Sequence, residues 1–376
     1  MFEGRNDNRV AVVGGGVIGL SVAWQAARAG WSVRLIDPDP GSGASWIAGG
    51  MLAPVTEGWP GEESVLDLGA HALAAWPAFA AELAEMATDP ALRTEGTLVV
   101  AFDTADREQL DRLADHLASL GREVTRLTGS AVRALEPSIA PSVRSGLSVR
   151  GDLSVDNRKL LHGLREAAAT CGVEFVARTA VAVRPGAVEL VDGSTLDCDV
   201  VVVSAGAWSR DLHPALSSLV RPVKGEILRL GARRSTVPLV RTVRALVESR
   251  PVYLVPRAGG EVVLGATQYE AGFDTGVTVA GVRDLLADAE RVMPGVAEYT
   301  LLESAAGPRA GSKDNLPVIG WLEPGVLVAT GHHRNGLLFA PTTAKAVTEL
   351  LAGRPLPESA RAAGVDRFSN SVPRKE

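Results

Sequence analysis

A strand–helix–strand unit at residues 9–37, with a glycine-rich turn inside it, limits what this chain can fold into more than any other stretch. Residues 10–13 form a short apolar, β-branched run, which predicts a buried strand. Residues 17–29 carry apolar side chains at helical spacing, and a second apolar run over residues 31–36 ends in Asp37. This order predicts two neighbouring parallel strands joined by a helix.

The turn between the first strand and the helix has the spacing G-x-G-x-x-G, with its glycines at Gly14, Gly16 and Gly19. The first glycine permits a tight turn, the second lets the backbone approach a pyrophosphate, and the third lets the helix pack close to the strand. Asp37 is placed to accept hydrogen bonds from a ribose diol. The unit predicts an adenine-dinucleotide site, the alternative being an ordinary turn without a ligand. It does not choose between NAD and FAD.

Small, uncharged residues follow two of the predicted strands. Residues 45–52 read SWIAGGML, and residues 205–208 read AGAW after the β-branched run at 199–204. Small side chains let a backbone lie against a large ligand, and ligands of open α/β sheets gather at the carboxyl ends of strands. We therefore expect both segments to line the ligand, although the first could also be a surface loop.

Composition and charge exclude several classes of protein. The chain has 376 residues, 46% of them apolar and 22% charged, which is ordinary for a globular protein long enough for two domains. Its net charge of -6 argues against a nucleic-acid partner, and no segment has the length of a membrane span. Residues 1–8 show no secretory signal. Cys171 and Cys198 lack the spacing of a disulfide framework or zinc site, so we expect buried thiols and a cytoplasmic protein.

The order of the predicted elements indicates two domains. Buried strands near residues 10, 33, 201 and 327 predict one parallel sheet, and antiparallel strands are expected between them, at residues 221–230, 250–255 and 261–266. Helices are expected at residues 65–87, 106–120, 128–135, 159–171, 282–292 and 335–351. We predict an α/β fold in which a discontinuous Rossmann-type domain is joined by an antiparallel α+β substrate-binding domain. The first comprises residues 1–75, 150–215 and 305–365, the second residues 76–149 and 216–304, and a polar tail occupies residues 366–376.

Five further segments resemble one family. They are ASWIAGGMLAP, RPVKGEIL, VYLVPR, GPRAGSKDNLPVIG and ATGHHRNGLLFAP, and with the amino-terminal unit they run in order from about residue 9 to residue 353. Together they resemble the glycine oxidases, flavoenzymes of thiamine biosynthesis in the superfamily of D-amino-acid and sarcosine oxidases. The resemblance implies an amino-acid-oxidase-like two-domain fold. It also implies noncovalent FAD, because neither cysteine lies where sarcosine oxidases often tether their flavin.

The resemblance also implies which residues surround the FAD. The GHHRNG turn at residues 331–336 matches the segment whose amides and following helix face the pyrimidine edge of the flavin, where a helix amino terminus stabilises negative charge. Val181 matches the residue whose backbone contacts adenine. The complete set implied for the cofactor is Gly14, Gly16, Val17, Ile18, Gly19, Asp37, Ala44, Ser45, Gly49, Gly50, Met51, Val181, Ala205, Gly206, Trp208, His332, His333, Arg334, Asn335, Gly336 and Leu337.

Four residues match the substrate pocket of that family. Arg309 matches the arginine that clamps the substrate carboxylate, which a guanidinium can do through two parallel hydrogen bonds. Tyr253 matches a tyrosine whose hydroxyl bonds the same carboxylate. Arg334 matches a second arginine near the entrance or the substrate, and Met51 completes the set.

Three other polar residues near these motifs have no assigned chemistry. His332 and His333 lack a third ligand at sensible spacing, so we predict no metal. We expect one of them to contribute only its backbone while the other packs or points to solvent. For Lys224 a place near the pocket and a structural salt bridge are equally open.

The resemblance implies oxidation of glycine, and of other small amino acids such as sarcosine or D-alanine, to the imine, with O2 reduced to H2O2. The imine of glycine would supply the thiazole of thiamine. The partners implied are a small amino acid and O2, within a homo-oligomer, often a tetramer. Three alternatives stay open: a sarcosine or D-amino-acid oxidase or dehydrogenase, an NAD-dependent dehydrogenase, and a non-catalytic binding module.

Overall fold

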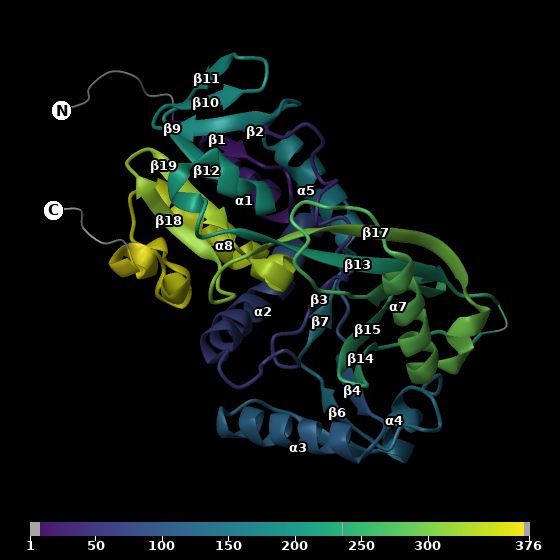
Figure 1. Ribbon diagram of the computed structural model, residues 1–376. Coiled ribbons are helices and arrows are strands. Elements are labelled where there is room, and N and C mark those ends of the chain that lie inside the picture. The colour runs from purple at the N-terminus through teal and green to yellow at the C-terminus, as the bar shows by residue number, and fades with distance from the viewer. Residues whose placement is uncertain (1–7, 235, 372–376) are drawn as a thin grey trace.

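The computed structural model describes residues 8–234 and 236–371, and it contains two large sheets (Figure 1). Residues 1–7, which belong to the segment where the sequence predicts no secretory signal, lie outside this description. A six-stranded sheet combines strands from the amino-terminal, central and last parts of the chain, and an eight-stranded sheet is built from strands between residues 97 and 311. In Figure 1 the first lies at the upper left, and the second lies at the lower right.

The six-stranded sheet has the order β18-β19-β12-β1-β2-β8. Its strands are β1 (Arg9–Val13), β2 (Ser32–Ile36), β8 (Glu174–Val176), β12 (Val200–Val203), β18 (Val318–Glu323) and β19 (Val326–Thr330). Strand β1 pairs in parallel with β2 and β12, and β12 pairs in parallel with β19. The four predicted parallel strands are therefore confirmed, while β18 joins the edge in the antiparallel direction.

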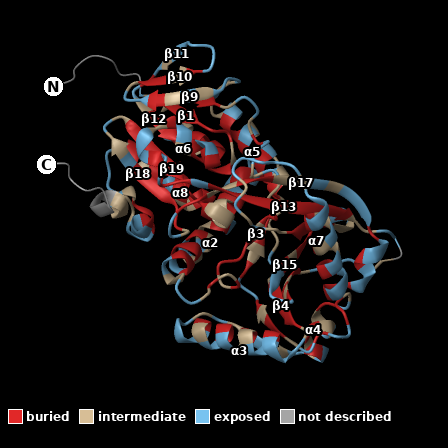
Figure 2. Cartoon of the chain, in the orientation of Figure 1, coloured by how far each residue is buried: buried red, intermediate tan, exposed pale blue. Residues whose placement is uncertain are grey.

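Alternation along β1 sends its side chains to two different cores. Val10 and Val12 pack toward the helices α1 (Val17–Arg28), α2 (Glu63–Ala84), α5 (Asn157–Thr170) and α8 (Gly336–Leu351). Ala11 and Val13 pack on the other face, beneath a small sheet of β9 (Ala180–Arg184), β10 (Ala187–Leu190) and β11 (Thr195–Asp197). A strand buried on both faces explains the unbroken apolar run in the sequence, and Figure 2 shows the sheet as buried.

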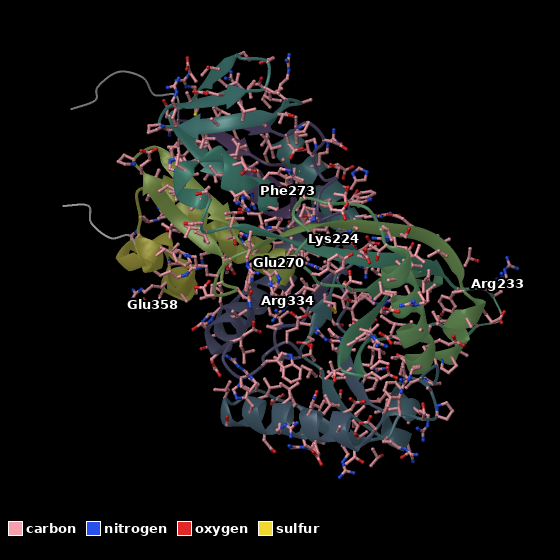
Figure 3. All side chains as sticks on the ribbon, in the orientation of Figure 1. Lys224, Arg233, Glu270, Phe273, Arg334 and Glu358 are labelled. Atoms are coloured by element: carbon pink, nitrogen blue, oxygen red, sulfur yellow. The ribbon has the colours of Figure 1, made fainter. Side chains whose placement is uncertain are left out.

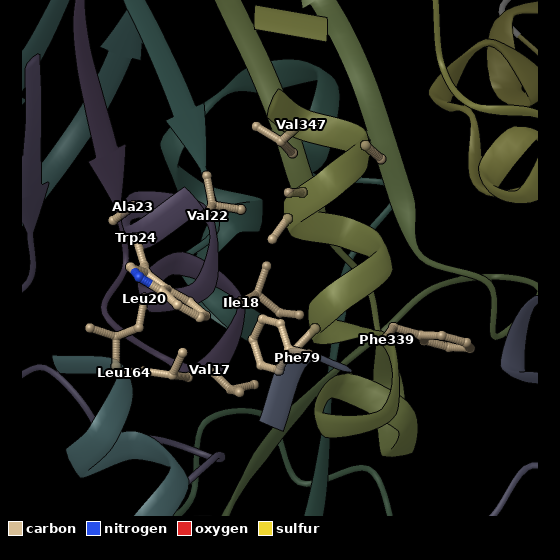
Figure 4. Packing of buried hydrophobic residues seen from close by; sticks show 14 of the residues in the cluster. Val17, Ile18, Leu20, Val22, Ala23, Trp24, Phe79, Leu164, Phe339 and Val347 are labelled. Carbon is tan, nitrogen blue, oxygen red and sulfur yellow. The ribbon is translucent and has the colours of Figure 1, made fainter. Parts of the chain in front are cut away.

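Aromatic contacts fix α1, α2 and α8 against one another (Figure 4). The ring of Phe79 lies 5.3 Å from that of Trp24 and 5.4 Å from that of Trp76, both edge-on. The indole nitrogen of Trp76 donates to the carbonyl of Leu338 at 3.0 Å. Such edge-to-face pairs stabilise a core beyond the area they bury. They hold the start of α8 in a fixed place relative to the first sheet.

The eight-stranded sheet has the order β17-β13-β16-β15-β14-β4-β6-β5. Its strands are β4 (Thr97–Ala101), β5 (Thr125–Thr128), β6 (Ser145–Val149), β13 (Arg221–Gly231), β14 (Thr242–Val247), β15 (Arg250–Pro256), β16 (Glu261–Gly265) and β17 (Thr300–Gly311). The predicted antiparallel group is confirmed by the pairing of β13 with β16 and of β16 with β15. Strands β14 and β17 were not among the expected elements. The long pair β13–β17 runs from this sheet toward the first one (Figure 1).

The remaining elements are short or lie at the periphery. They are β3 (Met51–Leu52), β7 (Leu153–Ser154), α3 (Thr104–Ser119), α4 (Gly129–Leu135), α6 (Ser209–Leu212) and α7 (Val279–Val292). Residues 358–363 and 365–371 form 3-10 helices, and the second of them includes the described part of the predicted polar tail. Ala360 and Ala363 are fully buried there, which the polar side chains around them concealed in the sequence. Residues 372–376 lie outside the description.

Candidate active site

Two connected cavities lie at the carboxyl ends of the parallel strands, where the first sheet meets β13 and β17. The larger, of about 560 Å³, is lined from Asp37 and Val181 at one end to His332 and Arg309 at the other. The smaller, of about 200 Å³, is bordered by the eight-stranded sheet. Both are lined by Val17, Ala44, Ser45, Arg309, His333 and Gly336. A ligand in the larger cavity therefore reaches the wall of the smaller one.

The turn after β1 forms a cradle that only glycine backbone fits. Gly14 has a φ of +105°, and a β-carbon there would lie 2.5 Å from the carbonyl oxygen of Ser204. A β-carbon on Gly19 would overlap the carbonyl oxygen of Gly14. The N-cap Gly16 provides no side-chain cap for helix α1 and the first turn has no acidic residue, while the N–H of Val17 donates to the hydroxyl of Ser45 at 3.0 Å. Its first amides and dipole are thus directed at the larger cavity, as a pyrophosphate site requires.

Asp37 lies at the end of β2, as the sequence predicted, and lines the same cavity. Its carboxylate accepts the backbone N–H of Gly15 at 2.6 Å and that of Asp39 at 2.8 Å. These bonds hold the acid in place beside the glycine turn. Val181, which is 46% exposed, lines the cavity from the small sheet.

The opposite end of the larger cavity is formed by the turn before α8. Helix α8 also begins without a side-chain cap and without an acid in its first turn. Burial lowers the pKa of His332 to about 3, and its Nε2 lies 3.0 Å from the hydroxyl of Thr343. Burial, together with Arg334 and Arg309, lowers the pKa of His333 to about 4. Both imidazoles are neutral at physiological pH.

His332 and His333 have no third potential metal ligand beside them in the described part of the chain. Among residues 8–234 and 236–371, no group of three His, Cys, Asp or Glu side chains is arranged to hold a metal ion. His332 packs in the interior, and the ring nitrogens of His333 are shielded without a hydrogen-bond partner in the described chain. Of the two expected alternatives, packing therefore describes these rings, although His333 is only half-buried.

Arg309 presents its guanidinium to the smaller cavity from β17. It lies opposite Val223 of β13, and the β-carbon of an alanine at Gly225 would overlap its guanidinium. The missing side chain at position 225 thus leaves the space that the guanidinium fills. Nη1 of Arg309 donates to the carbonyl of Thr267 at 3.3 Å. Within the described part of the chain, no carboxylate forms an ion pair with Arg309.

Tyr253 lies between two glycines at the wall of the same cavity. A β-carbon on Gly49 would lie 2.8 Å from its ring, and one on Gly265 would overlap its hydroxyl. Gly265 stands directly opposite Tyr253 in the β15–β16 pair. Burial raises the pKa of Tyr253, so its hydroxyl remains a hydrogen-bond donor at neutral pH.

A chain of charged side chains closes the smaller cavity on another side. Glu57 accepts from Nη1 of Arg244 at 2.5 Å and from Nε of Arg334 at 2.8 Å. Nη2 of Arg334 also donates to Glu62 at 2.6 Å. Burial alone would raise the pKa of Glu57, but the two guanidiniums lower it to about 2. Arg334, labelled in Figure 3, is therefore held by carboxylates of the chain.

The structure brings the predicted site residues together. Every residue predicted for the cofactor, except Gly19, lines one of the two cavities, and Gly19 packs against the cradle itself. Arg309, Tyr253, Arg334 and Met51 all line the smaller cavity. Lys224 forms a structural ion pair with Asp274, at 2.5 Å. Of the two alternatives that the sequence left open for Lys224, the structure shows the salt bridge.

Sequence reasoning missed Glu57, Arg244 and Gly225. Glu57 and Arg244 are separated by nearly two hundred residues and belong to no motif. A glycine inside a predicted strand often marks the close approach of another group. That signal was present at Gly225, within RPVKGEIL.

Comparisons with known proteins agree with this geometry. Residues 9–350 match the family described as FAD dependent oxidoreductase. The chain belongs to this family. FAD is therefore the cofactor that the larger cavity has to accommodate, which decides the choice that residues 9–37 left open.

Relatives of this family include proteins named glycine oxidase. The chain is 32% identical to the glycine oxidase of Geobacillus kaustophilus, over 91% of this chain and 92% of that protein. It is 36% identical to a putative thiamine biosynthesis oxidoreductase ThiO of Rhizobium etli, over 91% of this chain and 96% of that protein. The crystal structure of the Geobacillus kaustophilus enzyme superposes with a TM-score of 0.85 at 30% identity, covering 93% of this chain and 99% of that one.

The residues present fit FAD. The glycine cradle and the amino-terminal end of α1 suit its pyrophosphate, and Asp37 lies where the adenosine ribose would be held. The uncapped start of α8 suits the flavin end, beside the smaller cavity. Cys171 and Cys198 are free thiols that line neither cavity, and Cys198 is buried as expected whereas Cys171 is only half-buried. Burial raises the pKa of Cys198 to about 11, so that thiol is inert at neutral pH.

One further property concerns membranes. No helix in the described ranges combines the length and the apolar character needed to cross a bilayer.

Proposed function

We propose that this chain catalyses the FAD-dependent oxidation of glycine, and of other small amino acids such as sarcosine or D-alanine, to the corresponding imine. O2 accepts the electrons and becomes H2O2. The proposal rests on the relatives named glycine oxidase and on one observation in this chain. Arg309 is a guanidinium without a carboxylate partner in the described chain, facing a cavity of only about 200 Å³.

Arg309 and Tyr253 would hold the substrate by its carboxylate. A guanidinium can make two parallel charge-assisted hydrogen bonds to a carboxylate, which fixes its orientation as well as its position. The hydroxyl of Tyr253 adds a donor from an adjacent wall of the cavity. Restricting a bound substrate in this way contributes to the rate by proximity and orientation. When bound, FAD supplies the two-electron redox chemistry that the side chains lack.

The cavity offers no carboxylate that is free to act as a base. Glu57 is the acidic residue that lines it in the described structure, and its oxygens accept hydrogen bonds from Arg244 and Arg334. His333 is neutral, but its ring nitrogens are shielded. The substrate amine therefore has to lose its proton to water before or during binding, and reacts as the free base.

The alternatives are less well supported. Membership of the FAD-dependent family favours a flavin over the NAD-dependent dehydrogenase. The relatives named glycine oxidase favour a small amino acid over a bulky D-amino acid as the substrate. The glycine imine would supply thiazole synthesis, as the name of the Rhizobium etli relative suggests for that protein.

We extend the proposal to the setting in which the protein works. Two free cysteines suit a reducing compartment, so we place the protein in the cytoplasm. We also propose a homo-oligomer, because Leu301 and Leu302 are 48% and 55% exposed on β17, which is an edge strand. Light scattering of the purified protein measures its mass directly, and a monomer would contradict this part.

A substrate panel tests the proposed function. The holoenzyme is supplied with glycine, sarcosine, D-alanine and D-leucine at equal concentrations, and peroxide is measured. Glycine, sarcosine or D-alanine is expected to give the highest kcat/KM. A clear preference for D-leucine, with glycine inert, would contradict the proposal.

A further inference from the structure

The smaller cavity contains more positive charge than one substrate carboxylate requires. Three arginines line it, namely Arg244, Arg309 and Arg334. Arg309 is the one that forms no ion pair with a carboxylate among the described residues, whereas the other two share Glu57. The charge of Glu57 therefore determines how many of the three guanidiniums are unpaired and available to a ligand.

We propose that Glu57 is a specificity-determining residue that restricts the pocket to amino acids with a single negative group. It does so by neutralising Arg244 and Arg334, so that Arg309 alone recognises a carboxylate. This inference rests on the proposed function, which places the substrate carboxylate at Arg309.

The geometry lets one carboxylate serve both arginines. Oε1 of Glu57 accepts from Arg244 at 2.5 Å, and Oε2 accepts from Arg334 at 2.8 Å. The side chain of Glu57 is only 12% exposed, and those of Arg244 and Arg334 are 16% and 26% exposed. Because water screens such pairs weakly, the neutralisation is effective inside the pocket. Glu62 adds a second carboxylate to Arg334 from outside the cavity lining.

The structure also explains how Glu57 is held at this place. Its neighbour Thr56 donates from its hydroxyl to the carboxylate of Asp152 at 2.9 Å, and both side chains are buried. Arg244 reaches Glu57 from β14, directly opposite Tyr253 of β15. The sheet register thus fixes Arg244 next to the substrate-binding tyrosine. A second carboxylate on a substrate would meet Arg244 if Glu57 did not occupy it.

Without Arg309, the net charge of the pocket is zero. Arg244, Arg309 and Arg334 are balanced by Glu57 and Glu62, and His333 is neutral, which leaves one net positive charge. A monocarboxylate matches this charge. A dicarboxylate brings a second negative charge, which has to displace Glu57 or lie beside it unpaired. Either outcome opposes binding.

Two simple ligands probe this balance without turnover. Acetate carries one carboxylate, and malonate carries two in a molecule that is still small. We propose to measure the dissociation constants of both by titration calorimetry with the holoenzyme. The quantity of interest is the ratio of the malonate constant to the acetate constant. Glu57→Gln keeps the shape of the side chain and removes its charge, and this ratio is expected to fall about tenfold, equivalent to about 1.4 kcal/mol.

Two further variants guard against misfolding of Glu57→Gln. Arg244→Gln removes one of the neutralised cations, so the ratio is expected to rise instead of falling. The double variant Glu57→Gln/Arg244→Gln restores the charge balance and is expected to return the ratio toward that of the wild type. Glu82→Gln removes one negative charge and one exposed ion pair, to Arg28, far from the cavity, and serves as the matched control.

The results separate this inference from the proposed function. An unchanged ratio in Glu57→Gln, or a ratio in Arg244→Gln that does not rise, overturns the inference even if glycine is oxidised. A shift of the same size in Glu82→Gln would also overturn it, because net charge alone would then explain the effect. If glycine is not oxidised by the wild type while the ratio shifts as expected, the proposed function fails and the charge argument stands.

Discussion

The guanidinium of Arg309 fills the space that Gly225 leaves by having no side chain. The two residues belong to neighbouring strands, β17 and β13, and a β-carbon at position 225 would overlap the guanidinium. The carboxylate-binding group of the proposed enzyme is therefore positioned by an absent side chain on the next strand. Packing, rather than an ion pair within the described chain, holds Arg309 in place.

Gly225→Ala is expected to displace Arg309 and weaken substrate binding. The added methyl group overlaps the guanidinium, so Arg309 has to move away from the carboxylate position. The KM for glycine should rise at least about tenfold, equivalent to about 1.4 kcal/mol, while FAD remains bound. Steady-state kinetics measure this effect. Gly295→Ala is the control, because nothing lies within 4 Å of a β-carbon at that position. An unchanged KM in Gly225→Ala would show that packing against Gly225 does not position Arg309 for substrate binding.

Replacement of Arg309 itself tests the carboxylate clamp. Truncating one partner of a buried, hydrogen-bonded charge pair costs about 2–5 kcal/mol, so Arg309→Met should reduce kcat/KM for glycine by at least about thirtyfold. Arg309→Lys retains the charge but loses the planar fork and should fall between the two. The visible absorption spectrum of each variant reports whether FAD is retained. Full turnover by Arg309→Met would refute the assignment.

Gly14→Ala is expected to abolish FAD binding. Its β-carbon would lie 2.5 Å from the carbonyl of Ser204, and its φ of +105° disfavours any side chain. Gly30→Ala provides a matched control, because Gly30 also has a positive φ, of +91°, but nothing lies within 4 Å of its β-carbon. That variant should lose about 1–2 kcal/mol of stability and keep its flavin. Flavin content after desalting distinguishes the two. Equal flavin in both variants would contradict the cradle at Gly14.

Asp152 makes stability depend on pH in a predictable direction. Burial raises the pKa of Asp152 to about 7, partly offset by Thr56 and Arg244. The folded protein therefore binds one proton more than the unfolded chain between about pH 4 and pH 7. Stability from this group is present below pH 4 and falls by about 1.4 kcal/mol per pH unit as the pH rises through that window.

The substitution Asp152→Asn removes the loss of stability that deprotonation of Asp152 causes as the pH rises. The unfolding free energy of the variant, relative to wild type, should increase between pH 4 and pH 8 by up to about 4 kcal/mol. His332 and His333, whose pKa values are lowered by burial, act in the opposite direction but equally in both proteins. Urea unfolding of the FAD-saturated proteins at several pH values measures the difference. A difference independent of pH would indicate that Asp152 is ionised in the folded state throughout.

The parts of the fold that sequence could predict depend on local physics. The glycine spacing and the apolar runs of residues 9–37 specify β1, α1 and β2 without reference to the rest of the chain. Strands β12 and β19 were predictable because strands buried on both faces are continuously apolar. The placement of Arg309 and Tyr253 required resemblance to a family, since neither residue has a local signal.

The parts that could not be predicted arise from register between distant segments. Glu57 meets Arg244 and Arg334 only because three separate elements converge at one cavity. Strand β17 is mostly exposed over its first half, so its sequence lacks a clear apolar alternation. The residues after 357 are polar on average, yet Ala360 and Ala363 are buried, and small residues give a weak sequence signal. The domain boundaries drawn from the sequence stay predictions.

Anaerobic titration of the holoenzyme with glycine tests the central claim most directly. If the chain oxidises glycine with bound FAD, glycine alone should bleach the visible flavin absorption. Admitting O2 should restore it and release peroxide in an amount equal to the glycine consumed. Arg309→Met should require far more glycine for the same bleaching. A flavin spectrum that glycine leaves unchanged, while a bulky D-amino acid bleaches it, would contradict the account.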